Sequence, residues 1–366
     1  MRVAYTLEQC WHEVPGGTAV STLRVLTEIL RRRDVGDPAV ADVEIVGVAG
    51  RHRQPPGGQW VPPIPVRMLP VARPWLYETW TRFGWPRVES VTGDIDVCHA
   101  TAQIPAATRV PQVVTLHDVA FLSRPDRLTR HGAAVLTRAV ERARRADLVA
   151  CPSRTVRDEL LDHGFDAERI RVVPWGVDPV EVTDDRRREV AARHRLPERF
   201  VLAVATLEPR KNLRRLVDAV ARLDSPTPLV VAGASGWGGV TEELGAAGTG
   251  DARFLGHVPA PDLAVLIDLA SVLAYPSEAE GFGLPVLEAM AAGTPVVTSR
   301  GTATEEVAGD AAVLVDPFDV DAIAAGVALA LDDPDRLAAA GRARAASFTW
   351  SATADATIAM YRELSR

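Results

Sequence analysis

Short apolar runs alternate along the whole chain with longer segments whose apolar residues recur at helical spacing. The runs lie at residues 3–6, 43–48, 95–99, 113–116, 148–151 and 170–173 in a first series, and at 200–205, 229–233, 253–255, 271–275, 296–299 and 313–315 in a second. Alternation of this kind is typical of parallel sheets with helices on both faces. The pattern therefore predicts an α/β fold.

A polar stretch at residues 178–188 separates the two series. A chain of 366 residues is long enough for two domains. We therefore expect two Rossmann-like domains, residues 1–180 and 181–345, with parallel sheets that face a central cleft. The remaining residues, 346–366, contain an amphipathic segment at 350–364.

One glycine-broken loop stands between a predicted strand and a predicted helix. Gly281 and Gly283 follow the run 271–275, and Pro285 suits the first turn of a helix that begins near Leu284. Backbone N–H groups and the helix dipole favour an anion such as a diphosphate at such a place. An ordinary strand-to-helix turn is the alternative.

Two carboxylates flank this loop. Glu280 precedes the glycines, and Glu288 lies about one turn into the helix. Carboxylates accept hydrogen bonds, so this pair can bind sugar hydroxyls. The alternative for Glu288 is a solvated helix face.

The basic residues are almost all arginine. Of 41 basic side chains, 40 are arginine and one is lysine, Lys211, which follows Glu208, Pro209 and Arg210 after the run 200–205. A lysine ammonium is a compact point charge suited to phosphate oxygens, whereas arginine offers a planar fork. The pattern indicates a phosphate contact at Lys211, with compositional drift as the alternative.

Two further motifs follow predicted strands of the first series. Gly16 and Gly17 precede a helix, where side-chain-free backbone can approach a phosphate. His117 ends the run 113–116, and Asp118 follows it; the histidine can bond a sugar hydroxyl while Asp118 holds its ring. A plain turn and an ordinary loop histidine are the alternatives. Ligands bind beyond the carboxyl ends of parallel strands, where all these motifs fall.

The motifs together resemble one enzyme family. Glu280 and Glu288 resemble the E-x7-E signature of the retaining nucleotide-sugar glycosyltransferases of family 4, and residues 208–212 resemble its E-P-R-K-N phosphate-binding segment. Gly16-Gly17, His117-Asp118 and the segments 173–178 and 305–310 match in the same order. The resemblance implies the GT-B fold, with an acceptor-side first domain, a nucleotide-sugar-binding second domain, and residues 346–366 crossing back to the first.

The resemblance also implies an activity and a site. A hexose-type sugar would pass from a nucleoside diphosphate, GDP-mannose first and a UDP-sugar next, to a hydroxyl of a growing glycan, a lipid-linked acceptor or a small molecule, with retention. The implied catalytic residues are His117, Arg210, Lys211 and Glu280, and the implied donor-binding residues are Gly16, Gly17, Gly281, Phe282, Gly283, Leu284 and Glu288. Arginine, lysine and backbone N–H groups would stabilise the diphosphate, so no metal or cofactor is expected.

Composition narrows the partners and the location. A net charge of −7 and a pI near 5.7 argue against a nucleic-acid partner. Three widely spaced cysteines fit a reducing compartment and no metal cage. No run reaches the ~18 apolar residues of a membrane span, and the N-terminus enters a strand directly, so we expect a cytoplasmic protein without a secretion signal.

Other interpretations stay open at three places. Residues 75–85 hold five aromatics, which favour a helix packed inward, with an acceptor site or a membrane contact as alternatives. Arg31, Arg32 and Arg33 indicate a helix end, with contact to the inner face of a membrane as the alternative. Residues 233–239 form a glycine-rich loop without an assigned role. A same-fold epimerase or phosphorylase, or a non-catalytic nucleotide-sugar-binding protein, would carry similar phosphate-binding motifs.

Overall fold

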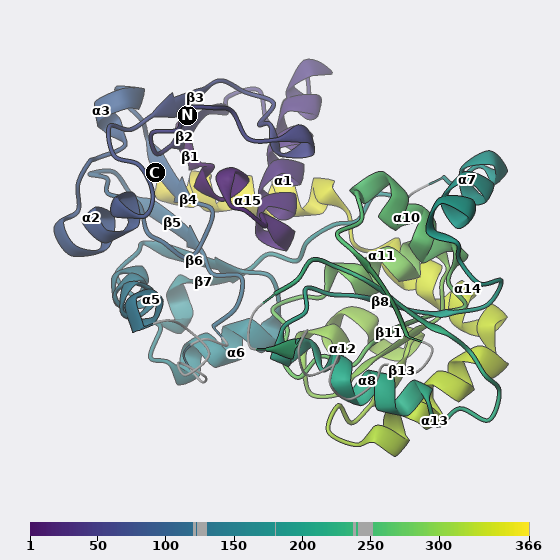
Figure 1. The fold of residues 1–366 in the computed structure, drawn as a ribbon. Helices are drawn as coiled ribbons and strands as arrows, with labels where there is room; N and C mark the ends of the chain where they lie inside the picture. The colour runs from purple at the N-terminus through teal and green to yellow at the C-terminus, as the bar shows by residue number, and fades with distance from the viewer. Residues whose placement is uncertain (120–121, 123–129, 180, 237–238, 241–251, 366) are drawn as a thin grey trace. The chain divides into compact units, whose positions relative to one another are not determined.

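The computed structural model describes residues 1–119, 122, 130–179, 181–236, 239–240 and 252–365. Residues 237 and 238 of the glycine-rich loop lie outside this part of the chain. The protein divides into two compact units, each built around its own sheet (Figure 1). Unit 1 comprises Met1–Gly176 and Thr349–Arg366, and unit 2 comprises Val177–Phe348.

Unit 1 contains a seven-stranded sheet in the order β3-β2-β1-β4-β5-β6-β7, and all of its strand pairs are parallel. The strands are β1 (Arg2–Thr6), β2 (Glu44–Ala49), β3 (Val66–Met68), β4 (Val97–Ala100), β5 (Gln112–Thr115), β6 (Leu148–Cys151) and β7 (Ile170–Val172). Six of them coincide with the apolar runs of the first series. The edge strand β3 was not predicted.

Unit 2 contains a six-stranded parallel sheet in the order β10-β9-β8-β11-β12-β13. The strands are β8 (Val201–Val204), β9 (Leu229–Ala232), β10 (Arg253–Gly256), β11 (Val272–Tyr275), β12 (Val296–Ser299) and β13 (Val313–Val315). Each coincides with an apolar run of the second series. The predicted fold class, two Rossmann-like α/β units with parallel sheets, is confirmed.

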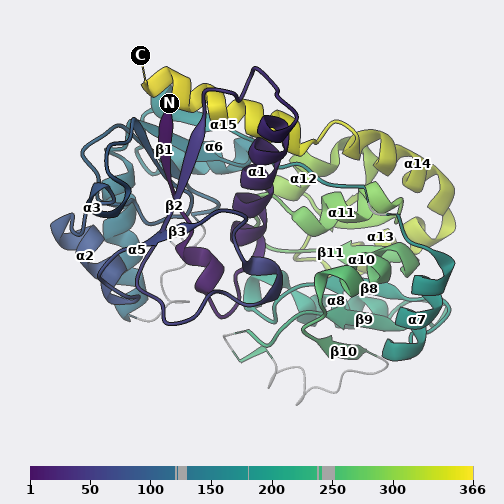
Figure 2. The ribbon, with the colours of Figure 1, turned by 90° about the horizontal axis from the view of Figure 1, so that it is seen from above.

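Helices cover both faces of each sheet, which explains why central strands such as β9 and β11 are buried at every position (Figures 1 and 2). Unit 1 has α1 (Gly16–Asp34), α2 (Trp75–Phe83), α3 (Glu89–Thr92), α5 (Arg130–Ala143), α6 (Arg154–Asp162) and α15 (Trp350–Leu364). Unit 2 has α7 (Asp184–His194), α8 (Leu213–Val220), α10 (Ala260–Leu269), α11 (Leu284–Ala292), α12 (Ala303–Ala308), α13 (Val320–Asp332) and α14 (Pro334–Ala345). Alternating strands and helices thus bury apolar side chains in each unit.

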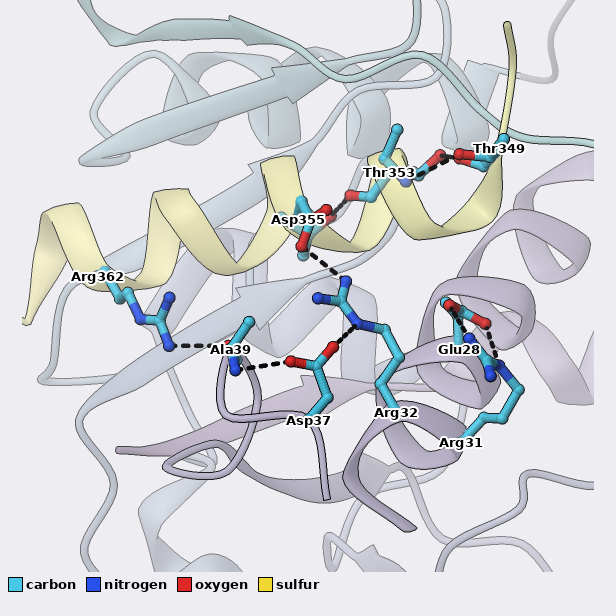
Figure 3. Close-up of polar contacts among 11 residues, drawn as sticks. Glu28, Arg31, Arg32, Asp37, Ala39, Thr349, Thr353, Asp355 and Arg362 are labelled. Carbon is cyan, nitrogen blue, oxygen red and sulfur yellow. Dashed lines mark hydrogen bonds and ion pairs between the residues drawn. The ribbon is translucent and has the colours of Figure 1, made fainter. Parts of the chain in front are cut away.

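The C-terminal helix α15 packs beside α1 in unit 1 (Figure 2). Arg32 of α1 lies between the two helices, where it donates to Asp37 at 2.7 Å and to Asp355 of α15 at 2.6 Å (Figure 3). Arg31 pairs with Glu28 at 2.8 Å. Arg32, the buried member of the arginine run, therefore joins two helices, whereas Arg31 pairs within its own helix.

The segment between the two series contains a helix that was expected to be a polar connector. α7 begins after Thr183, whose side chain caps it by accepting from the N–H of Arg186. Arg186 and Arg187 reach Asp262 and Asp268 of α10 at 2.8 and 2.7 Å. Ion pairs with α10 thus hold a helix that buries only Val190.

The aromatic segment at 75–85 corrects the expectation of an inward-packed helix. Trp80 is buried and donates its indole N–H to the carbonyl of Pro86 at 2.8 Å. Trp75, Phe83 and Trp85, however, are 69%, 76% and 54% exposed. Trp80 and Tyr77 therefore pack against the core, whereas the other three aromatics do not. Among the described residues, no helix has both the length and the apolar character that crossing a bilayer requires.

Candidate active site

A buried charge cluster lies at the carboxyl ends of the neighbouring strands β8 and β11 in unit 2. The Nζ of Lys211 donates to Oε1 of Glu280 at 2.5 Å and to the hydroxyl of Tyr275 at 2.7 Å. The two charged side chains are only 9% and 7% exposed. The sole lysine of the chain thus forms a buried ion pair with the first glutamate of the predicted motif.

Arg210 contacts the other oxygen of the same carboxylate. Its Nη1 lies 3.1 Å from Oε2 of Glu280 and donates to the carbonyl of Ala279 at 3.2 Å, while its Nε lies 2.8 Å from Glu208. Burial disfavours the charged carboxylate, but Lys211 and Arg210 outweigh this effect and lower the pKa of Glu280 to about 2. Glu280 is therefore ionised at neutral pH.

Burial also lowers the pKa of Lys211, and the adjacent Glu280 opposes this change. The two cations hold Glu280 between them, and Arg210 also pairs with Glu208, so the formal charges of the cluster cancel. A buried ammonium and a half-buried guanidinium close to a helix N-terminus can exchange these carboxylates for an anionic ligand with several oxygens. A diphosphate has this chemistry.

The loop that carries Lys211 is fixed to the loop that carries Glu280. Asn212 adopts a left-handed backbone conformation, with φ of 58°, and its Nδ2 donates to the carbonyls of Pro276 at 2.9 Å and Pro317 at 2.6 Å. The N–H of Glu278 donates to the carbonyl of Arg210 at 2.8 Å. These bonds hold the cations and the carboxylate in place.

The glycine loop leads directly into α11, with Pro285 in the first turn as predicted. Gly281, Phe282 and Gly283 are buried. Gly283 has a φ of +101°, and a Cβ there would lie 2.6 Å from the methyl of Thr304, so only glycine fits. Leu284 opens the helix and is also buried, and Phe282 packs edge-on against Phe348 at 6.1 Å.

Glu288 stands at the start of the second turn of α11 and is half-buried. It is not a fully solvated side chain, although it lies on a helix surface. The structure therefore places Arg210, Lys211, Glu280, Gly281, Phe282, Gly283, Leu284 and Glu288 on two adjoining loops and one helix of unit 2.

His117 lies in unit 1, just beyond β5, and is buried. Its Nε2 donates to the carbonyl of Thr101 at 2.9 Å, and its ring packs on Trp175 with centroids 5.4 Å apart. The ring is therefore held by Thr101 and Trp175; the expectation that Asp118 holds it is wrong, because Nδ1 has no hydrogen-bond partner.

This arrangement defines the protonation of His117. A carbonyl only accepts, so Nε2 carries the proton and Nδ1 presents a lone pair. Burial lowers the pKa of His117 and keeps the ring neutral at pH 7. His117 is thus an acceptor for a hydroxyl rather than a cation.

Gly16 and Gly17 begin α1 itself, two residues earlier than the predicted start near Thr18. Gly16 has a φ of +61°, and a Cβ built on it meets no atom within 4 Å. Both glycines are exposed. Their backbone is accessible at the end of a 19-residue helix, a place that suits an anion.

Three contributors to these sites were not predicted from the sequence. Tyr275 was recognised only as a strand end, yet its hydroxyl accepts from Lys211. Thr101 supplies the carbonyl that fixes His117, and Trp175 supplies the ring beneath it. Trp175 belongs to the family-like segment 173–178. That membership was the only sign in the sequence that Trp175 lies near a functional residue.

Two family models together match most of the chain. The model described as Glycosyltransferase Family 4 matches residues 15–181, and Glycosyl transferases group 1 matches residues 185–346. The O-antigen chain mannosyltransferase B of Escherichia coli is 34% identical over 267 residues, which are 69% of this chain and 70% of that protein. The chain belongs to glycosyltransferase family 4. It is therefore an enzyme of the glycosyltransferase class.

Other relatives of this family 4 chain differ in what they act on. The MMP alpha-(1->4)-mannosyltransferase of Mycolicibacterium hassiacum is 36% identical over 59% of this chain and 54% of that protein. Among solved structures, sucrose-phosphate synthase from Thermosynechococcus elongatus matches with a TM-score of 0.76 at 22% identity, over 100% of this chain and 99% of that one. Anabaena HepE in complex with UDP-glucose matches with a TM-score of 0.73 at 20% identity, over 99% of each chain. The GT-B fold class is thereby confirmed.

Proposed function

We propose that this chain transfers a hexose, mannose in the first instance, from a nucleoside diphosphate to a hydroxyl group of a glycan, with retention of the anomeric configuration. One observation carries the proposal: the buried cluster of Lys211, Arg210 and Glu280 beside the N-terminus of α11. Two cations, held by fixed loops next to a helix dipole, are suited to an anionic leaving group.

The reaction breaks the bond between the sugar and the diphosphate, so negative charge develops on the departing phosphate. Lys211, Arg210 and the backbone around Gly281–Gly283 stabilise that charge, in place of a metal ion. The donor diphosphate competes with Glu280 for the two cations. The carboxylate released in this exchange of partners accepts hydrogen bonds from the donor sugar, and Glu288 accepts from the ribose diol.

His117 binds a sugar hydroxyl through its unpartnered Nδ1. Retention follows from attack of the acceptor hydroxyl on the face that the diphosphate leaves, with a departing phosphate oxygen taking the acceptor proton.

The relatives support mannose as the first donor sugar. Both curated relatives described above are named mannosyltransferases, and mannose suggests GDP as its carrier. A solved structure of the same fold holds UDP-glucose, which makes a UDP-sugar the second choice. An acceptor glycan agrees with the O-antigen chain on which the first relative is named to act.

The donor class is tested by thermal unfolding with GDP, UDP, dTDP and ADP in separate samples, all with EDTA. A ligand that binds only the folded state stabilises it by about 2.7 kcal/mol at 100 times its Kd. If the donor is GDP-mannose, GDP should raise the midpoint temperature of unfolding more than the other nucleotides. No shift with any nucleotide, while the protein is folded, would contradict the assignment of Lys211 and the α11 loop as the donor site.

Turnover is tested with GDP-mannose and mannose oligosaccharides. We expect Lys211→Ala and Glu280→Ala each to lower kcat/KM at least about 100-fold, because Lys211→Ala removes a cation that stabilises the departing phosphate and Glu280→Ala removes the carboxylate that orients the donor sugar. Arg222→Ala, which breaks only an exposed pair with Asp321, is the matched control and should keep full activity. Formation of a different nucleotide sugar without an acceptor would point to the epimerase alternative, and cleavage of a glucan by inorganic phosphate would point to the phosphorylase alternative. The anomer of the product, read by NMR, tests retention.

A further inference from the structure

A groove of about 560 Å³ opens on unit 1. None of the site residues assigned above lines it, although Pro15, the neighbour of Gly16, does. Two segments form it, residues 10–15 after β1 and residues 52–60 after β2. Its walls include Trp11, His12, His52, Arg53, Gln54 and Trp60. Small-molecule sites occupy about 300–1,000 Å³, so the groove has the size of a binding site.

One aromatic wall of the groove is rigidly held. The rings of Trp11 and His52 stack with centroids 4.6 Å apart and an angle of 9° between their planes. The indole N–H of Trp11 donates to the carbonyl of Gln54 at 2.9 Å. Nε2 of His52 lies 3.1 Å from both oxygens of Glu8, a buried carboxylate that also accepts from the N–H of Gly50 at 2.7 Å. The stack is therefore fixed before a ligand arrives.

The charges of the groove do not select an anion. Arg53 and Glu13 contribute one charge of each sign. Burial, aided by Arg73 and His52, lowers the pKa of His12 to about 4, so its ring is neutral at pH 7. Its Nε2 lies 2.9 Å from the hydroxyl of Tyr77.

The residues of the groove do not indicate a metal site or a reactive thiol. Burial raises the pKa of Cys10 to about 12, so its thiol stays protonated and is a poor ligand and nucleophile. Across the part of the chain that the structure describes, no three histidine, cysteine or carboxylate side chains gather in a metal-binding group. The groove therefore offers a ligand two indole rings, Trp11 and Trp60, surrounded by polar groups. These polar groups are either neutral or of opposite charges that cancel.

That combination fits a neutral polyhydroxylated ligand. The flat face of an indole packs against the C–H face of a pyranose, while guanidinium, carboxylate and amide groups bond its hydroxyls. The groove also ends beside a candidate site, because Pro15 lines it and Gly16 begins α1. We propose that this groove binds a saccharide unit of the acceptor glycan, with Trp60 and the Trp11–His52 stack as its platforms. The inference rests on the proposed glycosyl transfer and specifies its acceptor.

The test uses full-length protein and separates acceptor binding from donor chemistry. Trp60→Ala should raise the KM for mannotriose about tenfold or more, because the variant loses one stacked aromatic ring. Nucleotide release from GDP-mannose without an acceptor, and the thermal shift with GDP, should stay unchanged. Trp85→Ala, an exposed tryptophan outside the groove, is the matched control and should change neither quantity.

A second variant keeps the test valid if Trp60→Ala fails to fold. Arg53 is exposed, so Arg53→Ala should fold normally and still raise the acceptor KM, with kcat unchanged. Unchanged acceptor KM in both variants would overturn the proposal.

Direct binding distinguishes this inference from the proposed function. Mannotriose and maltotriose are titrated into wild type and Trp60→Ala, with tryptophan fluorescence as the readout. Saturable quenching in the wild type that is lost in Trp60→Ala supports the groove even if no donor is turned over, in which case only the proposed function fails. Quenching by inorganic phosphate, or no quenching by either trisaccharide, overturns the assignment.

Discussion

At the residue scale, the proposed donor site contains one carboxylate, Glu280, bound by two cations. Lys211 and Arg210 hold Glu280 in its ionised form although the group is buried. Removal of either partner from a buried pair is costly, because the remaining charge loses its compensation. Replacement of Glu280 by another anion therefore costs less free energy than leaving Lys211 and Arg210 without an anionic partner.

This pairing has a consequence for stability in acid. The pKa of Glu280 falls from 4.5 to about 2 on folding, so its ionised form stabilises the fold by about 3 kcal/mol above pH 4.5, and this contribution is lost as the pH falls toward 2. The difference in unfolding free energy between wild type and Glu280→Gln should therefore narrow from pH 7 to pH 3 in urea titrations. A difference independent of pH would show that the cations do not hold Glu280 ionised.

His117 should matter for transfer through its acceptor lone pair. His117→Phe keeps an aromatic ring against Trp175 but removes Nδ1 and leaves the carbonyl of Thr101 without its donor. We expect kcat/KM to fall about 10- to 100-fold, the value of one or two hydrogen bonds. Steady-state kinetics with saturating acceptor measure the change. Full activity, in a variant that unfolds at the wild-type midpoint, would exclude His117 from the reaction.

The sequence predicted that Lys211 and Glu280 lie beyond the carboxyl ends of strands, but it did not predict the protonation state of His117, for a physical reason. β8 and β11 are neighbours in a parallel sheet, so the loops at their carboxyl ends must meet, and opposite charges there pair. The proton on His117, by contrast, is fixed by a carbonyl 16 residues away, at Thr101 beyond β4. A main-chain carbonyl leaves no mark on side-chain identity.

At the element scale, α15 is fastened to unit 1 by a buried hydrogen bond as well as by apolar packing. The hydroxyl of Tyr361 lies 2.6 Å from Nδ1 of His99, whose Nε2 lies 2.7 Å from the hydroxyl of Thr115 in β5. All three elements, α15, β4 and β5, thus share one polar chain within the core.

Tyr361→Phe should test this attachment. The change leaves a buried nitrogen of His99 without a partner, which costs about 1–3 kcal/mol. We expect a corresponding loss in unfolding free energy by urea denaturation. Arg362→Ala, on the exposed side of the same helix, removes contacts to Ala39 and Asp42 and should cost less than about 1 kcal/mol. Equal losses in the two variants would contradict the importance of the buried bond.

Two elements escaped prediction because neither buries a periodic apolar face. β3 has three residues at a sheet edge, and Arg67 and Met68 are exposed. α7 buries only Val190 and depends on ion pairs with α10. Its capping residue Thr183, followed by Asp184 and Asp185, was the available helix-start signal. Hydrophobic periodicity predicts the elements that build cores, and these two do not.

At the scale of the whole molecule, the two ends of the sequence belong to the same unit. Residues 1–176 and 349–366 form unit 1, whereas unit 2 is one continuous stretch. Deletion of 349–366 should therefore weaken unit 1 selectively. Hydrogen exchange should show lost protection in α1 and β5, with β8, β9 and β11 protected as before; equal loss in both sheets would contradict this division.

This discontinuous arrangement also sets an order of events during synthesis. A ribosome releases the residues of β1 and α1 early, yet the helix that covers α1 and contributes Tyr361 to the core is encoded after the whole of unit 2. Unit 2 has all its residues available before α15 exists. The half of the protein that is made first must therefore complete its fold last, and until then the nascent chain carries an uncovered face of unit 1 that chaperones can recognise.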